Sequence, residues 1–210
     1  YVREAGTCGE QKAAETILQE LKKENSDAQI RTEEFSFFAP QIKRSFFEVT
    51  APYHKVYEAC TFGFCANTDE NGLEADFVYL ENADDINMKQ ANGKIVMLNN
   101  YMSRTLVKAG ALGFVSFSGT PIDTGKKRLP TSKNLGQSKT LAEIPGTCIH
   151  FVDAAEIVEK GALRVRMICE QTLVEKTSQN IIIPFSNLFG YCWFVSILFN
   201  TAKATDRSSQ

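Results

Sequence analysis

The amino-acid sequence predicts an α/β fold, in which a β-rich domain with short flanking helices follows an N-terminal helix and strand. Three observations predict it. A capping box precedes an amphipathic helical run near the N-terminus. Aromatic and β-branched residues crowd residues 36–66, as expected of strands. Residues 94–117 read as strand, helix and strand, which is the pattern of a parallel β-α-β unit.

The N-terminal helix is predicted from its cap and its apolar face. Thr7 and Glu10 have the T-x-x-E spacing of a capping box. One helical face then carries Ala13, Ala14, Ile17, Leu18 and Leu21. Residues 29–35 alternate and predict a strand. For residues 36–66 we expect short strands joined by turns, with Pro40 at one of the breaks.

The middle of the chain has the most regular pattern. Residues 76–80 predict a strand. The run 94–98, which is apolar after Lys94, predicts a strand that is covered on both faces. A short helix should begin near Ser103 and end at Gly110. Residues 112–117 then predict a second buried strand, so the three elements together indicate a right-handed β-α-β crossover.

The region that follows begins with a long polar loop. Residues 119–143 carry several lysines and few apolar side chains, so we interpret them as a solvated surface loop. Residues 144–149 predict a strand. We expect Asp153 and Glu156 to cap the next helix, because acidic side chains favour a helix N-terminus. Residues 162–170 predict one further strand.

The C-terminal segment differs from the rest in composition. Residues 177–202 contain no charged side chain, and the apolar run 181–199 approaches the ~20 residues that span a bilayer. Pro184 and Gly190 interrupt that run. An apolar segment of this size indicates a partner, a membrane or self-association. We therefore expect the chain to self-associate, and deletion of residues 184–210 to give a more soluble monomer with unchanged strand content.

Composition and charge exclude some classes of protein. The 210 residues are 43% hydrophobic and 23% charged, which is ordinary for a folded domain. A formal net charge of -2 excludes a strongly basic nucleic-acid binder, so we expect no nucleic-acid partner. The six cysteines are irregularly spaced, and a chain of this length needs no disulfides to fold. We therefore expect reduced thiols and a cytoplasmic protein.

The two histidines are the first candidates for a site. His150 and Asp153 resemble a ligand pair, but a strand-end histidine beside a helix-capping aspartate explains them better. His54 lies in a Pro-Tyr-His-Lys turn, and no partner is near it in sequence. Two histidines in such contexts do not predict a metal site.

The remaining candidates are one acidic pair and one cysteine pair. Glu33 and Glu34 could supply a bridging carboxylate, although acidic pairs on an edge strand are usually solvated. Cys60 and Cys65 have no second Cys or His pair at zinc-finger spacing. The residues taken alone therefore predict no catalytic residue and no metal ligand.

A family resemblance is carried by five short motifs. Residues 3–14 read R-E-A-G-T-C-G-E-Q-K-A-A, and this resembles the opening helix of two-metal, zinc-dependent aminopeptidases. Residues 92–98 (N-G-K-I-V-M-L) and 107–116 (V-K-A-G-A-L-G-F-V-S) resemble the protease-associated (PA) domain inserted in that family. The motif I-P-G at 144–146 fits the same insert, and T-S-Q-N-I-I at 177–182 resembles the return to the peptidase core.

The resemblance covers residues 1–183 and implies three regions. Residues 1–35 would be the helix and strand of a peptidase core, residues 36–175 a PA-like domain, and residues 176–210 a return strand with a divergent apolar tail. In the family the PA domain covers the active site and shapes the access of peptide substrates. The intact enzymes bind two zinc ions.

The sequence departs from the family where the metal ligands should begin. In the family an H-x-D motif follows the return strand, and the sequence has no counterpart of it after Pro184. No zinc ligand or general base can therefore be transferred, and we expect a truncated, non-catalytic portion without bound metal. The alternative is a stand-alone interaction module, or one tethered to a membrane through residues 181–199.

Overall fold

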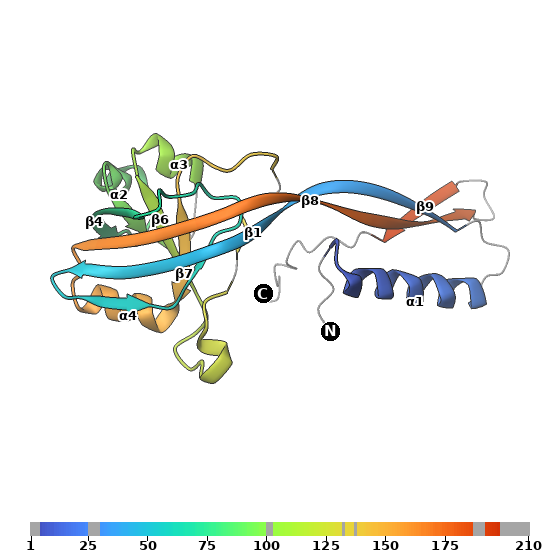
Figure 1. The fold of residues 1–210 in the computed structure, drawn as a ribbon, viewed down its shortest axis with the longest axis horizontal. Coiled ribbons are helices and arrows are strands. Elements are labelled where there is room, and N and C mark those ends of the chain that lie inside the picture. The colour runs from blue at the N-terminus through green and yellow to red at the C-terminus, as the bar shows by residue number, and fades with distance from the viewer. Residues whose placement is uncertain are drawn as a thin grey trace. The chain divides into compact units, whose positions relative to one another are not determined.

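The computed structural model describes residues 5–24, 30–99, 103–131, 133–136, 138–186 and 192–197. The chain divides into two compact units. Unit 1 consists of Tyr1–Phe37 and Glu175–Gln210, and unit 2 consists of Phe38–Val174. Unit 2 is therefore inserted in the sequence between the two segments of unit 1. Figure 1 labels the elements of both units.

Unit 1 begins with the predicted helix, α1 (Cys8–Glu24). The Thr7 side of the predicted capping box is seen, because the Glu10 backbone N–H lies 3.4 Å from Thr7 Oγ1. The Glu10 carboxylate also accepts the N–H of Gly6, one residue before Thr7, at 2.5 Å. The helix buries Ala13 and Ala14. Parts of the long strands β1 (Arg31–Ala51) and β8 (Arg164–Ser186), together with β9 (Cys192–Ile197), complete the described elements of this unit.

Unit 2 contains short strands and short helices. They are β2 (Lys55–Tyr57), β3 (Ala59–Thr61), β4 (Leu73–Tyr79), α2 (Asp85–Met88), the 3-10 helix η1 (Lys89–Ala91), β5 (Ile95–Met97), α3 (Ser103–Lys108), β6 (Gly113–Ser118), the 3-10 helix η2 (Gly125–Arg128), β7 (Gly146–His150) and α4 (Phe151–Glu159). The described strands follow the order β2-β1-β8-β4-β5-β6-β7-β3, and β9 pairs with β8. The fold is thus β-rich, with a few short helices and an N-terminal helix.

The β-α-β prediction is confirmed. β5 and β6 are parallel neighbours joined through α3, with Ile95 opposite Gly113 and Met97 opposite Val115. β4 and β7 extend the parallel set on either side. All three residues of β5 are buried, which explains the unbroken apolar run in the sequence. Gly110 ends the α3 segment with a φ of 77°, a conformation that glycine adopts without steric cost.

Residues 36–51 do not form the short strands that we expected from the sequence. They belong to the single strand β1, which runs through Pro40 without a break. The neighbour β2 pairs only with Phe47, Glu48 and Val49, so it does not reach Pro40. The missing N–H of proline therefore costs no hydrogen bond to β2, and a proline is tolerated on such an edge.

β8 is also longer than predicted. It continues past residue 170 to Ser186, through a polar stretch that does not alternate in hydropathy. Leu73–Asp76 of β4 pair with its beginning, and β9 pairs with its end, from Ile181 opposite Ile197 to Ser186 opposite Cys192. The expectation that deleting residues 184–210 leaves strand content unchanged is therefore wrong, because the deletion removes β9.

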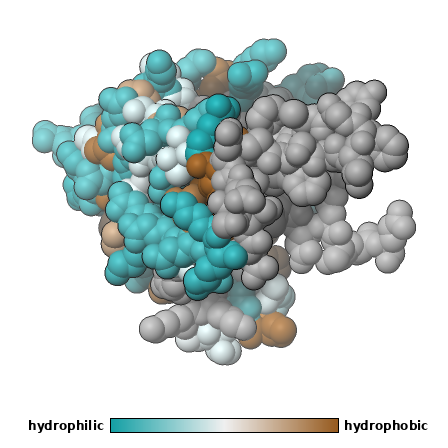
Figure 2. Space-filling view, turned by 90° about the vertical axis from the view of Figure 1, so that its right-hand side faces the viewer, coloured by the Kyte–Doolittle hydropathy of each residue, from teal (hydrophilic) through white to brown (hydrophobic). Residues whose placement is uncertain are grey.

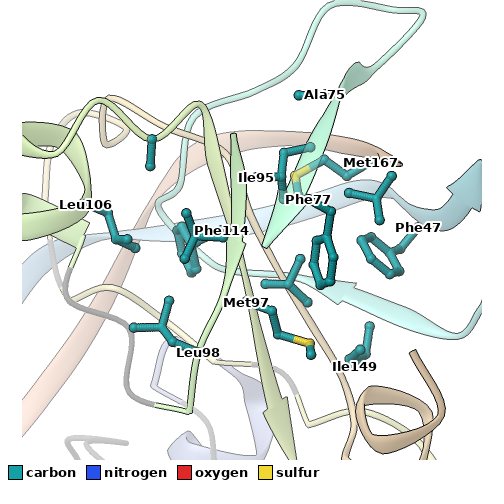
Figure 3. Packing of buried hydrophobic residues seen from close by; sticks show 14 of the residues in the cluster. Phe47, Ala75, Phe77, Ile95, Met97, Leu98, Leu106, Phe114, Ile149 and Met167 are labelled. Atoms are coloured by element: carbon teal, nitrogen blue, oxygen red, sulfur yellow. The ribbon is translucent and has the colours of Figure 1, made fainter. Parts of the chain in front are cut away.

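The core of unit 2 is built by the two faces of its sheet. Figure 3 shows Phe47, Phe77, Met97 and Ile149 gathered between strands that are distant in sequence. The rings of Phe62 and Phe114 meet edge-on, with centroids 5.0 Å apart. The predicted core residues Ile95, Val96, Leu98, Phe114 and Val115 are all buried, with Phe117 and Val107 packed against them. On the face in Figure 2 the described residues are mostly hydrophilic.

Candidate functional site

Polar side chains gather where β6 and β7 end. Ser118 is the last residue of β6 and His150 is the last residue of β7, and the two are register partners. The carboxyl ends of parallel strands are the usual edge for ligands in α/β proteins. A serine and a histidine at this edge are candidates for a nucleophile and its general base.

His150 uses both of its ring nitrogens within the fold. Its side chain is fully buried, and its Nδ1 accepts a hydrogen bond from Val152 N–H at 3.2 Å. The proton of a neutral imidazole must then be on Nε2, which lies 3.4 Å from Asp123 Oδ2. Asp123 is itself fixed by Thr120 N–H at 2.8 Å. His150 thus caps α4 and secures the start of the loop that follows β6.

The predicted cap of this helix is wrong in one respect. α4 is capped by His150, not by Asp153 and Glu156. Asp153 lies in the first turn, where burial raises the pKa of its carboxyl group. Glu156 lies further along the helix and binds Lys160 at 2.6 Å and Lys55 at 2.8 Å, and these hydrogen bonds lower its pKa. The ligand-pair reading of His150 with Asp153 gains no support, because His150 binds Asp123.

Ser118 is engaged away from the histidine. Its Oγ accepts a hydrogen bond from Thr131 N–H at 3.0 Å and one from the Cys148 thiol at 3.5 Å. In a Ser-His catalytic pair the serine hydroxyl gives its proton to an imidazole nitrogen. Neither nitrogen of His150 is available for that, so Ser118 and His150 do not form a catalytic pair in this structure.

A lysine and a serine meet deeper in the same region. Lys133 Nζ donates to Ser116 Oγ at 3.1 Å and to the Phe117 carbonyl oxygen at 3.0 Å. Ser116 is completely buried, and its hydroxyl donates to the Asn99 carbonyl at 3.4 Å. A buried serine cannot meet a substrate, so this contact anchors the 119–143 loop to β6.

The second histidine belongs to a charge cluster. His54 Nε2 lies 3.2 Å from Glu48 Oε2, and Arg166 Nε lies 2.6 Å from Glu48 Oε1. Glu48 is buried, whereas the side chain of His54 is 70% exposed. Although the Arg166 Nε contact is close, its N–H is not aligned as a hydrogen bond. The arrangement compensates a buried carboxylate and offers no open metal position.

The other predicted candidates are not brought together. Glu33 and Glu34 are exposed on β1, and Glu33 pairs with Arg31 at 3.2 Å. Cys60 lies on β3 opposite Cys148 of β7, whereas Cys65 is buried in the hydrophobic core, so the two cysteines do not form a pair. Among the residues that the structure describes, no three His, Cys, Asp or Glu side chains are placed to hold a metal ion.

Sequence reasoning missed a polar cluster around Gln171 in unit 2. This buried amide accepts from Phe64 N–H at 2.9 Å and donates to the carbonyl oxygens of Phe62 and Cys65 at 3.0 and 2.9 Å. Asn67 binds the backbone of Gln171 in both directions. Gln171 follows Glu170 in a polar stretch, so no sequence signal marks it as buried.

A shallow polar hollow lies next to this cluster. Its volume is about 440 Å³, and it is lined by Arg44, Asn67, Thr68, Asp69, Glu70, Ile168 and Glu170. Its acidic groups are exposed, and Arg44 Nη1 is 3.5 Å from the Glu70 carbonyl oxygen. Exposed charges of both signs do not define a ligand, and we assign no binding role to the hollow.

Comparison with known proteins gives no sequence relative but clear structural ones. No family model and no curated protein matches the sequence. The fold is similar to an aminopeptidase from Aneurinibacillus sp. strain AM-1, with a TM-score of 0.64 at 20% identity over 89% of this chain and 45% of that one. A peptidase M28 precursor from Shewanella amazonensis SB2B gives a TM-score of 0.64 at 16% identity, over 88% of this chain and 47% of that one.

A third solved structure has the same fold. The zinc aminopeptidase BSAP from Bacillus subtilis matches with a TM-score of 0.58 at 19% identity, over 89% of this chain and 43% of that one. The chain therefore spans less than half the length of each of these proteins. In the part of the chain that the structure describes, no helix is long and apolar enough to cross a bilayer.

Proposed function

We propose that the chain corresponds to the N-terminal part of a zinc aminopeptidase-like protein and is not catalytic by itself. Residues 36–175 are its PA-like domain, which in the intact protein would cover the active site and shape the access of peptide substrates. Residues 1–35 and 176–210 are the segments of the peptidase core on either side of that domain.

One observation carries this proposal. The structural likeness extends over 88–89% of the chain, which is more than unit 2 alone, so it must include parts of both units. Unit 2 interrupts unit 1 in the sequence, as an inserted access domain would. The two segments of unit 1 are joined by a buried hydrogen bond between Glu10 and Ser178, and both residues lie in motifs that resemble the family.

The proposed lack of catalysis follows from the chemistry of the family. A two-zinc peptidase needs ligands for each metal, a bridging carboxylate and a general base. The described histidines are His54 and His150, and both are bound to carboxylates in structural roles. The H-x-D motif that opens the metal site in the family has no counterpart after β8. In an intact protein, two zinc ions would be held by residues outside this sequence.

The proposed partners follow from the same assignment. Peptide substrates would pass the PA-like domain, and no nucleic acid is expected for a chain of net charge -2. We also propose that the protein self-associates through the apolar residues of its C-terminal segment and that it is cytoplasmic.

The coding sequence downstream of codon 210 tests the proposal. If the chain is the first part of such a peptidase, the genomic sequence should encode an H-x-D motif shortly after the segment that matches β8, in this frame or in a shifted one. Genomic sequence with no such motif in any frame would contradict the proposal and favour a stand-alone interaction module.

A further inference from the structure

Two thiols meet in the core of unit 2. Cys65 and Cys169 are both completely buried, although roughly 100 residues separate them in the sequence. Cys65 Sγ lies 3.5 Å from the Gly146 carbonyl oxygen, and Cys169 Sγ lies 3.4 Å from the same oxygen. Both thiols therefore approach the same backbone oxygen.

The two thiols are also coupled chemically. The hydrogen bond to Cys169, together with burial, holds the pKa of Cys65 well above its usual range. The same hydrogen bond lowers the pKa of Cys169. Both directions describe one arrangement, in which the Cys65 S–H donates to Cys169.

The backbone holds the two cysteines in place from both sides. Thr68 N–H donates to the Cys169 carbonyl at 2.9 Å, and Cys169 N–H lies 3.2 Å from Thr68 Oγ1. On the other side, Gln171 binds the Cys65 carbonyl at 2.9 Å and Phe64 N–H at 2.9 Å. The segment that contains Cys65 is therefore tied to β8 before any covalent bond forms between them.

The residue before Cys65 has an unusual backbone conformation. Phe64 has a φ of 69° and is the one non-glycine residue with positive φ among the described residues. Bulky residues adopt this conformation rarely, and it persists only where the surroundings impose it. Phe64 directly precedes Cys65, and its N–H donates to Gln171 Oε1 in this conformation.

We propose that Cys65 and Cys169 are a disulfide site, which closes when unit 2 folds in the presence of a disulfide oxidant such as oxidised glutathione. Such a bond would clamp the turn at residues 62–66 to β8. Unit 2 would then exist in two forms, a reduced form with two thiols and an oxidised form with the disulfide.

The exchange balances with glutathione disulfide as the oxidant. When the sulfurs are exposed either cysteine can attack first; if Cys169 does, its thiolate attacks one glutathione sulfur, and a mixed disulfide forms while one glutathione thiolate leaves. Cys65 gives its proton to that thiolate and attacks the Cys169 sulfur, so the second glutathione leaves and the Cys65–Cys169 bond forms. Two protein thiols are oxidised, and glutathione disulfide is reduced to two thiols. Because both sulfurs are buried, the exchange needs an open or unfolded state, and we expect it to be fast during refolding and slow in the folded chain.

A second thiol pair serves as an internal control. Cys60 and Cys148 face each other across β3 and β7, but their thiols donate to different acceptors. Cys60 donates to the Pro130 carbonyl at 3.4 Å, and Cys148 donates to Ser118 Oγ at 3.5 Å. The structure therefore favours Cys65 with Cys169 as the pair that oxidises.

The test is to refold the full chain with oxidised and reduced glutathione, alkylate it in denaturant without reduction, and count labelled cysteines by intact mass. We expect four labels on the oxidised chain and six on the reduced chain, which has six cysteines. Peptide mapping should find Cys65 linked to Cys169. The melting temperature should rise by roughly 5–15 °C on oxidation, and a phosphine reductant should reverse this rise.

Variants decide between the pairs. A Cys60→Ala, Cys148→Ala double variant should still lose two labels on oxidation. Cys65→Ala should form no intramolecular disulfide, and any label that it loses should be replaced by the mass of a glutathione adduct. Six labels on the wild-type chain after oxidative refolding would overturn the proposal. It would also be overturned by a map that shows only Cys60 linked to Cys148. Because both results come from denatured wild-type chain, they hold even if a variant fails to fold.

Discussion

The hydroxyl of Ser178 donates a hydrogen bond to the carboxylate of Glu10, and both side chains are almost completely buried. The other Glu10 oxygen accepts Gly6 N–H at 2.5 Å. The Glu10 carboxylate thus contributes to the start of α1 and also binds Ser178 of β8, which lies far along the sequence. The contact joins the two segments of unit 1 that flank the inserted unit.

The first prediction concerns this contact. Ser178→Ala should lower the free energy of unfolding by about 1.5–3 kcal/mol, because a buried carboxylate loses a charge-assisted hydrogen bond. Urea unfolding followed by circular dichroism measures it. Glu15→Gln, on the exposed side of α1, is the matched control and should change stability by less than about 0.5 kcal/mol. Equal effects of the two changes would show that the Glu10–Ser178 contact does not stabilise the unit.

The second prediction concerns the core of unit 2. Ile95→Asp should abolish cooperative unfolding, because it places an unpaired charge at a fully buried position of β5. Ile86→Asp is the control, since Ile86 is 78% exposed on α2. Thermal denaturation of both variants gives the answer. An Ile95→Asp protein that melts like the parent would show that this strand is misplaced.

The third prediction concerns the α4 cap. His150→Ala should cost about 1–2 kcal/mol, because Val152 N–H and Asp123 both lose their partner. His150→Asn should recover part of that loss, since an asparagine side chain can also cap a helix. Denaturant titration compares the two. No difference between alanine and asparagine would indicate that packing, rather than capping, is the role of His150.

The fourth prediction concerns acid stability. Hydrogen bonds from Arg164 at 2.8 Å and from Thr50 lower the pKa of Glu74 in the folded state. Its stabilising effect is therefore present at neutral pH and is lost as the pH falls below the ordinary carboxyl range and through the folded pKa. Glu74→Gln should reduce the stability lost between neutral and acid pH, whereas Glu81→Gln, at an exposed site, should not. Matching pH profiles for wild type and Glu74→Gln would contradict this.

The fifth prediction concerns the C-terminal segment. The full chain should self-associate, because residues 181–199 are uncharged and largely apolar. Deleting residues 184–210 should yield a largely monomeric protein that has lost the strand signal of β9. Light scattering and circular dichroism on both proteins measure these effects. A monomeric full chain whose truncated form aggregates would show that the segment is needed for the fold.

Local patterns predicted the elements whose information lies within a few residues. The T-x-x-E spacing gave α1, and the apolar runs on either side of Ser103 gave β5 and β6. β1 and β8 were not recognised as long strands, because they lie side by side in the sheet although they are far apart in sequence. The pairing explains why β1 tolerates Pro40 and why β8 continues through polar residues.

The polar clusters show a similar division. The sequence predicted that His150 ends a strand before a helix, but not that its ring would cap the helix. Cysteine spacing did not predict that Cys65 meets Cys169, because that contact depends on how β8 lies beside the segment before β4. Gln171 was missed for the same reason. The roles of such buried polar residues depend on contacts between distant segments, and these contacts exist only in the folded chain.

The most direct measurement of the central claim is the metal content and peptidase activity of the purified chain. Elemental analysis after incubation with zinc and gel filtration should find no stoichiometric metal, and aminoacyl p-nitroanilide substrates should not be hydrolysed, because the sequence offers no ligand set for a two-metal site. About two zinc ions per chain together with hydrolysis would contradict the account, since the chain would then hold a catalytic centre of its own.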